Sequence, residues 1–126
     1  MKPISTLLAV APMVLGSLLG CNPCKETVAG QVSSAEYLAT ISKRDCGAMG
    51  RGSTLVSIRL NGVPDNDTHG GIVLDLYGNK DVHLSWRDSR DLRIDCPSCR
   101  PSDVDSQTVK SAGVTIHYGA ELTPPI

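Results

Sequence analysis

Short runs of alternating apolar and polar residues occupy much of the chain between positions 37 and 118. In residues 55–60, for example, Val56, Ile58 and Leu60 fall on one side of an extended chain, and Ser57 and Arg59 fall on the other. Successive side chains of a β-strand point to opposite faces, so this period of two predicts half-buried strands. Six runs show it: residues 37–41, 55–60, 72–77, 82–86, 92–96 and 114–118.

Glycine, proline, asparagine and aspartate gather between these runs and supply the residues that turns require. Most connections are too short for a crossover helix, so consecutive strands are expected to pair antiparallel. The apolar face of such a meander has to be covered, which favours a small sandwich or a partly closed barrel over an open sheet. We therefore expect an all-β fold, a single small antiparallel meander of about six strands.

The first 20 residues have the layout of a secretory signal. Lys2 provides the one charge of a short head, and residues 4–19 contain no ionisable side chain. A membrane-spanning helix is the alternative, but it needs about 20 apolar residues. This run is shorter, and Pro12 and Gly16 interrupt it. We expect the segment to be cleaved as a signal peptide.

The signal ends in Leu18-Leu19-Gly20-Cys21, which resembles the lipobox of bacterial lipoproteins. The resemblance implies that the Cys21 thiol carries diacylglycerol, that cleavage falls between Gly20 and Cys21, and that the new amino group can be acylated. Two or three acyl chains anchor a protein stably in a membrane. Asn22 stands where lipoproteins kept on the inner membrane often have Asp. The resemblance therefore implies a periplasm-facing envelope protein and favours the outer membrane over the inner one.

Cleavage leaves 106 residues, enough for one domain with a single core. The remaining chain contains 11 Lys and Arg and 13 Asp and Glu, and it has no basic patch of the kind that binds nucleic acid. The chain lacks Phe, so the core has to rest on Val, Ile and Leu and on covalent ties. The expected organisation is a signal peptide at 1–20, a lipidated tether at 21–34, a β domain at 35–122 and a disordered tail at 123–126.

Four cysteines remain once Cys21 is assigned to lipid. An even number of cysteines in an exported chain predicts two disulfides. Four cysteines allow three pairings, and in two of them Cys46 joins Cys96 or Cys99 across the sheet. The predicted disulfide residues are Cys24, Cys46, Cys96 and Cys99.

A second resemblance spans most of residues 24–96. Its pieces are, in chain order, Cys24, a short strand at 37–41, an Arg-Asp-Cys-Gly turn at 44–47, a Ser-rich strand at 53–58, and Trp86 with Leu92 and Ile94. Together they are similar to a group of small bacterial proteins of unknown function, although Ala48-Met49 departs from the Ala-Thr-Thr of that group. The resemblance implies a β-rich domain and a bridge between Cys24 and Cys46, which leaves Cys96 for Cys99. It implies no activity.

The Cys96-Pro97-Ser98-Cys99 segment has the spacing of a redox pair, in which one thiolate can have a lowered pKa. In the thioredoxin arrangement the first cysteine lies at a helix N-terminus within a βαβ unit. No helical pattern follows here, so a structural disulfide is favoured. Two cysteines without a second pair or a nearby histidine also leave a zinc site incomplete.

Two further groups of polar residues are candidate sites. Residues 65–71 resemble the opening of a calcium loop, but the twelfth position is Leu76 rather than Glu, so a solvated loop is favoured. His83, Ser85 and His117 fall on the polar faces of their strands, without a nucleophile elbow or an oxyanion loop. We expect no metal, no cofactor and no catalytic residue, and Trp86 belongs to the core.

These observations predict a lipid-anchored, non-catalytic binding or structural module that faces the periplasm. Its partners would be membrane lipid, through acylated Cys21, and an unknown envelope protein, but not nucleic acid. Inhibitors and immunity proteins form a subclass of this prediction, by analogy of size and address. The alternative is a periplasmic thiol-disulfide redox protein that uses Cys96 and Cys99.

Overall fold

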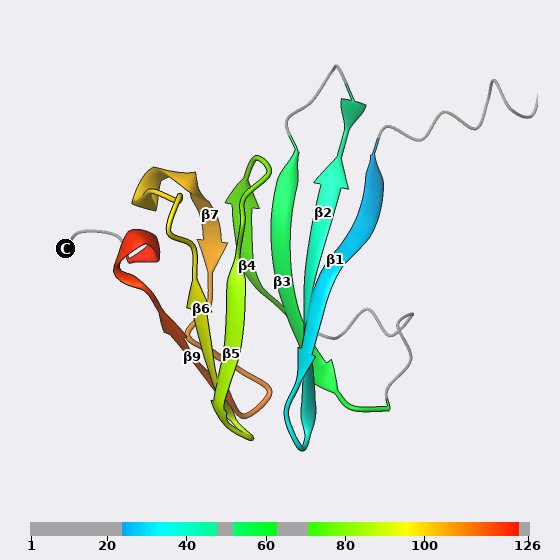
Figure 1. Cartoon of the computed structure of the whole chain (residues 1–126), viewed down its shortest axis with the longest axis vertical. Coiled ribbons are helices and arrows are strands. Elements are labelled where there is room, and N and C mark those ends of the chain that lie inside the picture. The colour runs from blue at the N-terminus through cyan, green and yellow to red at the C-terminus, as the bar shows by residue number, and fades with distance from the viewer. Residues whose placement is uncertain (1–23, 48–51, 63–70, 124–126) are drawn as a thin grey trace, which may run out of the picture.

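Nine β-strands within the described residues form two sheets that face each other as a sandwich (Figure 1). The computed structural model describes residues 24–47, 52–62 and 71–123. Its strands are β1 (Lys25–Ser33), β2 (Tyr37–Asp45), β3 (Ser53–Leu60), β4 (Gly71–Tyr77), β5 (His83–Asp88), β6 (Asp91–Asp95), β7 (Val104–Gln107), β8 (Lys110–Ser111) and β9 (Val114–Tyr118). Two short 3₁₀ helices, η2 (Pro101–Asp103) and η3 (Ala120–Leu122), accompany them.

The two sheets differ in how their strands pair. Sheet A has the order β1-β2-β3-β4-β7, and its neighbours are all antiparallel. Sheet B has the order β5-β6-β9-β8, in which β6 and β9 are parallel. The all-β class and the sandwich are thus confirmed, and of the two expected arrangements, a sandwich or a partly closed barrel, the two sheets form the sandwich. The purely antiparallel meander of six strands is wrong, because the chain leaves β6, adds β7 to sheet A and returns to sheet B before β9.

The segment expected as a tether contributes the first strand of sheet A. Residues 25–33 pair with β2 from Lys25 opposite Asp45 to Ser33 opposite Leu38. The tether at 21–34 is therefore wrong for these residues, whereas 21–23 lie outside the described residues. β1 is an edge strand whose side chains are mostly exposed on both sides, so its backbone ladder forms without the apolar alternation by which strands are recognised.

The core lies between the sheets and follows the period of two in most strands, but β4 departs from it. In β4, Ile72 is 52% exposed whereas Val73 is only 1% exposed. A register shift against β3, between Val56 and Ser57, causes this departure. The bulge turns Ile72 to the outer face and Val73 inward. The buried core residues are Tyr37, Ala39, Val56, Ile58, Val73, Leu74, Leu76, Val82, Leu92, Ile94, Cys96, Cys99, Val114, Ile116 and Leu122.

Loops at one end of the sandwich carry both disulfide pairs, and we call this the disulfide end (upper end in Figure 1). The opposite end carries the β1–β2, β5–β6 and β8–β9 turns. In the described part of the chain, no helix is long and apolar enough to cross a membrane. Of the tail expected at 123–126, Thr123 is hydrogen-bonded to the backbone of Gly119 and Ala120, and the remainder lies outside the described residues.

Candidate functional site

The four predicted disulfide cysteines form two bridges. Cys24 is bonded to Cys46, and Cys96 is bonded to Cys99. This is the favoured pairing, and the alternative that joins Cys46 to Cys96 or Cys99 does not form. Cys21, the predicted lipidation site, lies outside the described residues.

Burial speaks against a redox role for the second bridge. Cys96 is 0% exposed and Cys99 is 6% exposed, and both belong to the core between the sheets. Thiol-disulfide exchange requires that an attacking thiolate reach one of the two sulfurs. The bridge is followed by the three residues of η2 rather than by an α-helix. Its position is that of a structural tie.

The outer face of sheet B is covered by charged side chains. Arg93 makes a bidentate ion pair with Asp95, with nitrogen–oxygen distances of 2.9 and 3.0 Å. Nε2 of His117 lies 3.6 Å from Oδ1 of Asp91. Opposite charges are therefore interspersed on this face, as on an ordinary solvated surface.

The predicted histidines and serine do not form a catalytic group across this face. In the strand register, Arg93 of β6 lies opposite Ser85 of β5 on one side and opposite His117 of β9 on the other. Arg93 therefore separates Ser85 from His117. His83 lies 3.5 Å from the carboxylate of Asp81 and is exposed. Among the described residues, no cluster of three or more His, Cys, Asp and Glu side chains could hold a metal ion.

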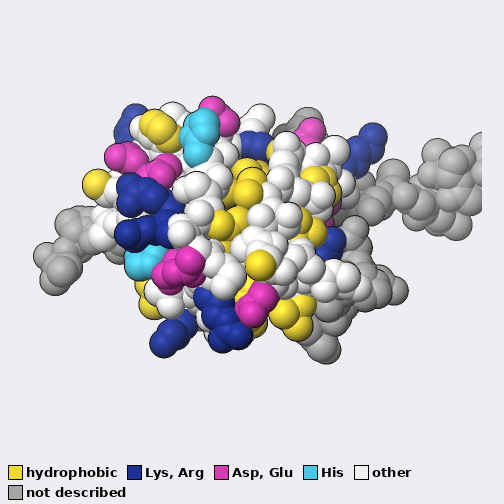
Figure 2. All heavy atoms as spheres, turned by 60° about the horizontal axis from the view of Figure 1, so that its bottom comes forward, with side chains coloured by type: hydrophobic (Ala, Val, Ile, Leu, Met, Phe, Trp, Pro, Cys, Tyr) yellow, Lys and Arg dark blue, Asp and Glu magenta, His cyan; other side chains and the backbone are white. Residues whose placement is uncertain are grey.

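The outer face of sheet A has a different character. Val28, Ile72 and Tyr77 are exposed on it, and each lies opposite a serine of the neighbouring strand. In the described part of the chain, the exposed large apolar residues all lie in β1, β3, β4 or the β7–β8 connection: Val28, Val32, Leu60, Ile72, Tyr77 and Val109. In Figure 2, charged and histidine side chains gather on the left, where β5, β6 and β9 lie in Figure 1. Uncharged groups prevail on the right, over β1 to β3.

A shallow hollow of about 310 Å³ lies on the outer face of β1, β2 and β3. Its floor consists of Thr40, Ser42 and Ser57, whose small side chains leave space between longer neighbours. Nε2 of Gln31 donates a hydrogen bond to Oγ1 of Thr40 at 3.3 Å. The rim is formed by Glu26, Val28 and Arg59. None of these residues could be recognised as a site residue from motifs in the sequence, although hydroxyls at alternate positions of neighbouring strands indicate a floor of small side chains.

Charged groups surround this hollow: an ion pair joins β1 and β2, and acidic side chains lie on β4 and β7. Nη2 of Arg44 lies 3.2 Å from Oε1 of Glu26, and the Tyr77 hydroxyl donates a hydrogen bond to Asp105 at 2.7 Å. Burial raises the pKa of Asp75, and the nearby carboxylate of Asp105 raises it further, whereas Arg44 opposes the shift. The charged form of Asp75 is therefore disfavoured in the folded protein.

Replacing Asp75 by Asn is expected to raise the free energy of unfolding at pH 7 by a few tenths to about 1 kcal/mol. The folded-state pKa is above the ordinary value of 3.8, so protonation of Asp75 stabilises the fold at low pH. That contribution is lost as the pH rises through the raised pKa. The gain from Asp75→Asn should therefore shrink as the pH falls through the raised pKa, and be smallest below the ordinary pKa of 3.8. Urea unfolding at pH 7 and pH 3.5 checks this, and an equal gain at both values would contradict it.

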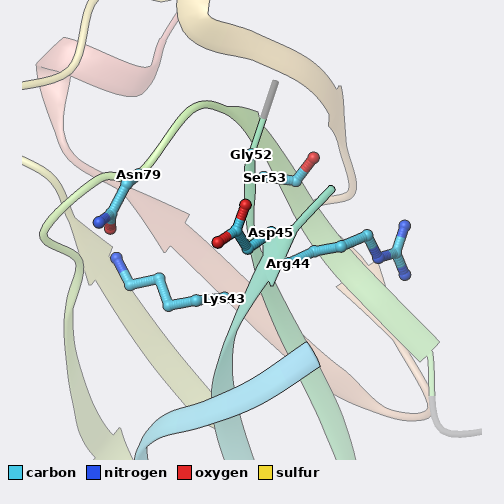
Figure 3. Close-up of a pocket in the computed structure, with 6 residues that line it drawn as sticks. All are labelled: Lys43, Arg44, Asp45, Gly52, Ser53 and Asn79. Atoms are coloured by element: carbon cyan, nitrogen blue, oxygen red, sulfur yellow. The ribbon is translucent and has the colours of Figure 1, made fainter. Parts of the chain in front are cut away.

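A second hollow of about 280 Å³ lies at the disulfide end. Figure 3 shows Lys43, Asp45 and Asn79 on one side of β2, with Arg44 and Ser53 pointing to the other. The ammonium of Lys43 donates a hydrogen bond to the carbonyl of Lys80. Burial lowers the pKa of Lys43, although the charge of Asp81 opposes this. The hollow offers an amine, a carboxylate and an amide to a polar group outside it.

The polar loop at 65–71 falls on residues 63–70, outside the described residues, apart from Gly71, which begins β4. No protein-family model, curated protein or solved structure matches the chain. The lipoprotein signal and the resemblance based on the Arg-Asp-Cys-Gly turn therefore stay predictions.

Proposed function

We propose that the protein is a lipid-anchored, periplasm-facing binding module, without catalytic activity, whose outer face of sheet A docks an envelope protein. One observation carries this proposal: exposed apolar side chains lie on sheet A, whereas sheet B presents interspersed charges. Centres of protein interfaces are depleted in charged residues and enriched in aromatic and apolar ones. The part of the outer face of sheet A around Val28, Ile72 and Ser57 comes closest to that composition, with the charged Glu26 and Arg59 at its edge.

The hollow on this face adds a feature that a flat sheet lacks. Val28 stands on its rim, and Ile72 pairs with Ser57 of its floor. A partner side chain inserted between them would lose contact with water, and such central contacts contribute most of the binding energy in protein interfaces. Arg59 and Glu26 on the rim supply charged groups that can set the orientation of the partner.

The proposed address rests on the sequence and on the disulfides. The resemblance of residues 18–21 to a lipobox supports a lipid anchor at Cys21. Two disulfides fit an oxidising compartment such as the periplasm. A small docking module at this address suits an inhibitor or an immunity protein, which acts by covering a surface of another protein.

Photo-crosslinking in the native envelope tests the proposal. With p-benzoylphenylalanine in place of Ile72, we expect one discrete protein adduct, whereas the same residue in place of Ser85, on the outer face of sheet B, should give none. Ile72→Asp should weaken capture of the partner by at least about fivefold, since a central interface side chain contributes more than about 1 kcal/mol. Intact mass of the purified chain reports acylation of Cys21. Equal adducts at both positions would contradict the docking face.

A further inference from the structure

The folded domain begins only three residues after the proposed lipid anchor. Cys24 is held by its disulfide to Cys46, and the next residue, Lys25, is already paired with Asp45. Three residues of extended chain span at most about 11 Å. We infer that the disulfide end of the sandwich rests on the headgroup layer of the membrane; this inference rests on the proposed acylation of Cys21.

The disulfide prevents this short link from growing by fraying of the edge strand. Without a covalent tie, the first residues of an edge strand could peel from the sheet and lengthen the tether. Here Cys24 cannot separate from the end of β2. β4 alone has seven residues and is about 23 Å long, so the link is only about half the length of a strand. The disulfide end cannot turn away from the bilayer while Cys21 stays in it.

Neighbouring loops extend the surface that faces the lipid. Lys80, in the β4–β5 loop, accepts a hydrogen bond from Lys43 through its carbonyl, and its ammonium lies 3.3 Å from a carboxylate oxygen of Asp103. Asp103 also accepts a hydrogen bond from the backbone N–H of Arg100, just after the second disulfide. The β4–β5 loop, the Cys96–Cys99 loop and the end of β2 thus form one connected surface at this end (Figure 1).

The chemistry of this surface fits headgroups rather than acyl chains. Its charges offset one another, because Lys80 pairs with Asp103 and Lys43 lies near Asp81. The exposed apolar residues Leu60 and Val109 lie toward the opposite end, at the close of β3 and after β7. Tyr77, at the end of β4, is exposed at the disulfide end, and its hydroxyl is hydrogen-bonded to Asp105. A polar, nearly balanced surface does not insert into hydrocarbon and is not drawn to anionic lipid over long distances. The covalent anchor, rather than surface charge, holds it in place, and the outer faces of both sheets remain open sideways.

Energy transfer from tryptophan to dansyl-labelled phosphatidylethanolamine in vesicles tests the inference on the full-length, lipidated protein. In a Trp86→Phe background, Asn79→Trp places the donor at the disulfide end, and Val109→Trp places a matched donor toward the opposite end. β4 separates these ends by about 20 Å. We expect severalfold stronger transfer from position 79 than from position 109.

A second experiment lengthens the link with a spacer. It uses the native Trp86 as the donor, so no residue has to be substituted. Sixteen Gly and Ser residues inserted after Asn22 add an average reach of about 22 Å. Transfer from Trp86 should then fall severalfold, whereas the same spacer appended after Ile126 should leave it unchanged. Equal transfer from positions 79 and 109, or no effect of the inserted spacer, in a protein whose mass shows acylated Cys21, overturns the inference and leaves the anchor standing. A mass without lipid overturns the anchor and the inference together.

Discussion

Replacing Cys24 and Cys46 together by Ala is expected to lower the free energy of unfolding by about 3 kcal/mol. The bridge joins residues 22 positions apart, so it removes many conformations from the unfolded chain. It also pins the edge strand β1 to β2 at the point where their pairing begins. Urea unfolding of the full-length protein in detergent, followed by the fluorescence of Trp86, measures the loss.

The second disulfide provides the matched control. Cys96 and Cys99 are only three positions apart, so their bridge closes too small a loop to restrict the unfolded chain much. Replacing both by Ala should lower the free energy of unfolding by roughly 1 kcal/mol, mainly through lost packing of two buried side chains. A larger loss than in the Cys24 and Cys46 variant would show that chain entropy does not explain the stabilisation.

Trp86→Ala is expected to lower the free energy of unfolding by about 2–3 kcal/mol, somewhat less than for a fully buried ring. Trp86 packs against the core from β5 and stacks on Tyr37 of β2, with ring centroids 6.3 Å apart. Its Nε1 donates a hydrogen bond to the carbonyl of Val32 in β1 at 2.8 Å. One side chain thus joins sheet B to the first two strands of sheet A.

The variant Trp86→Phe separates the two contributions. It keeps an aromatic ring against Tyr37 but loses the donor to Val32, so it should cost only about 1 kcal/mol. Circular dichroism of both variants during urea unfolding provides the measurement, since the fluorescent ring is absent. Equal losses in Trp86→Phe and Trp86→Ala would mean that the hydrogen bond, rather than packing, carries the stabilisation.

The period of two predicted those strands that have one buried face. Val56 and Ile58, or Leu92 and Ile94, alternate with polar neighbours because one side of each strand faces the core. β1 was not predicted, because neither of its faces is buried and its pairing depends on backbone groups that every sequence has. The outward orientation of Ile72 was not predicted either, for another reason. It depends on a bulge whose position is set by the partner strand.

The candidate site divides in the same way. The disulfide cysteines could be predicted because their chemistry is local and because an even number of cysteines, in a chain expected to be exported, indicates disulfides. The proposed docking face could not, because its hollow combines Thr40, Ser57 and Val28 from three strands. Each of these is an ordinary strand residue by itself. Their significance arises from the register that places them side by side.

The amino-acid sequence by itself determined the all-β class, the core positions of most strands and the cysteines available for pairing. These properties depend on side-chain polarity at a spacing of two and on residue chemistry, which are local. Only the tertiary structure decided that β1 is part of sheet A, that β6 and β9 run parallel, and that both disulfides lie at one end of the sandwich. These depend on hydrogen bonds between backbone segments far apart in the chain, and backbone groups carry no sequence signal.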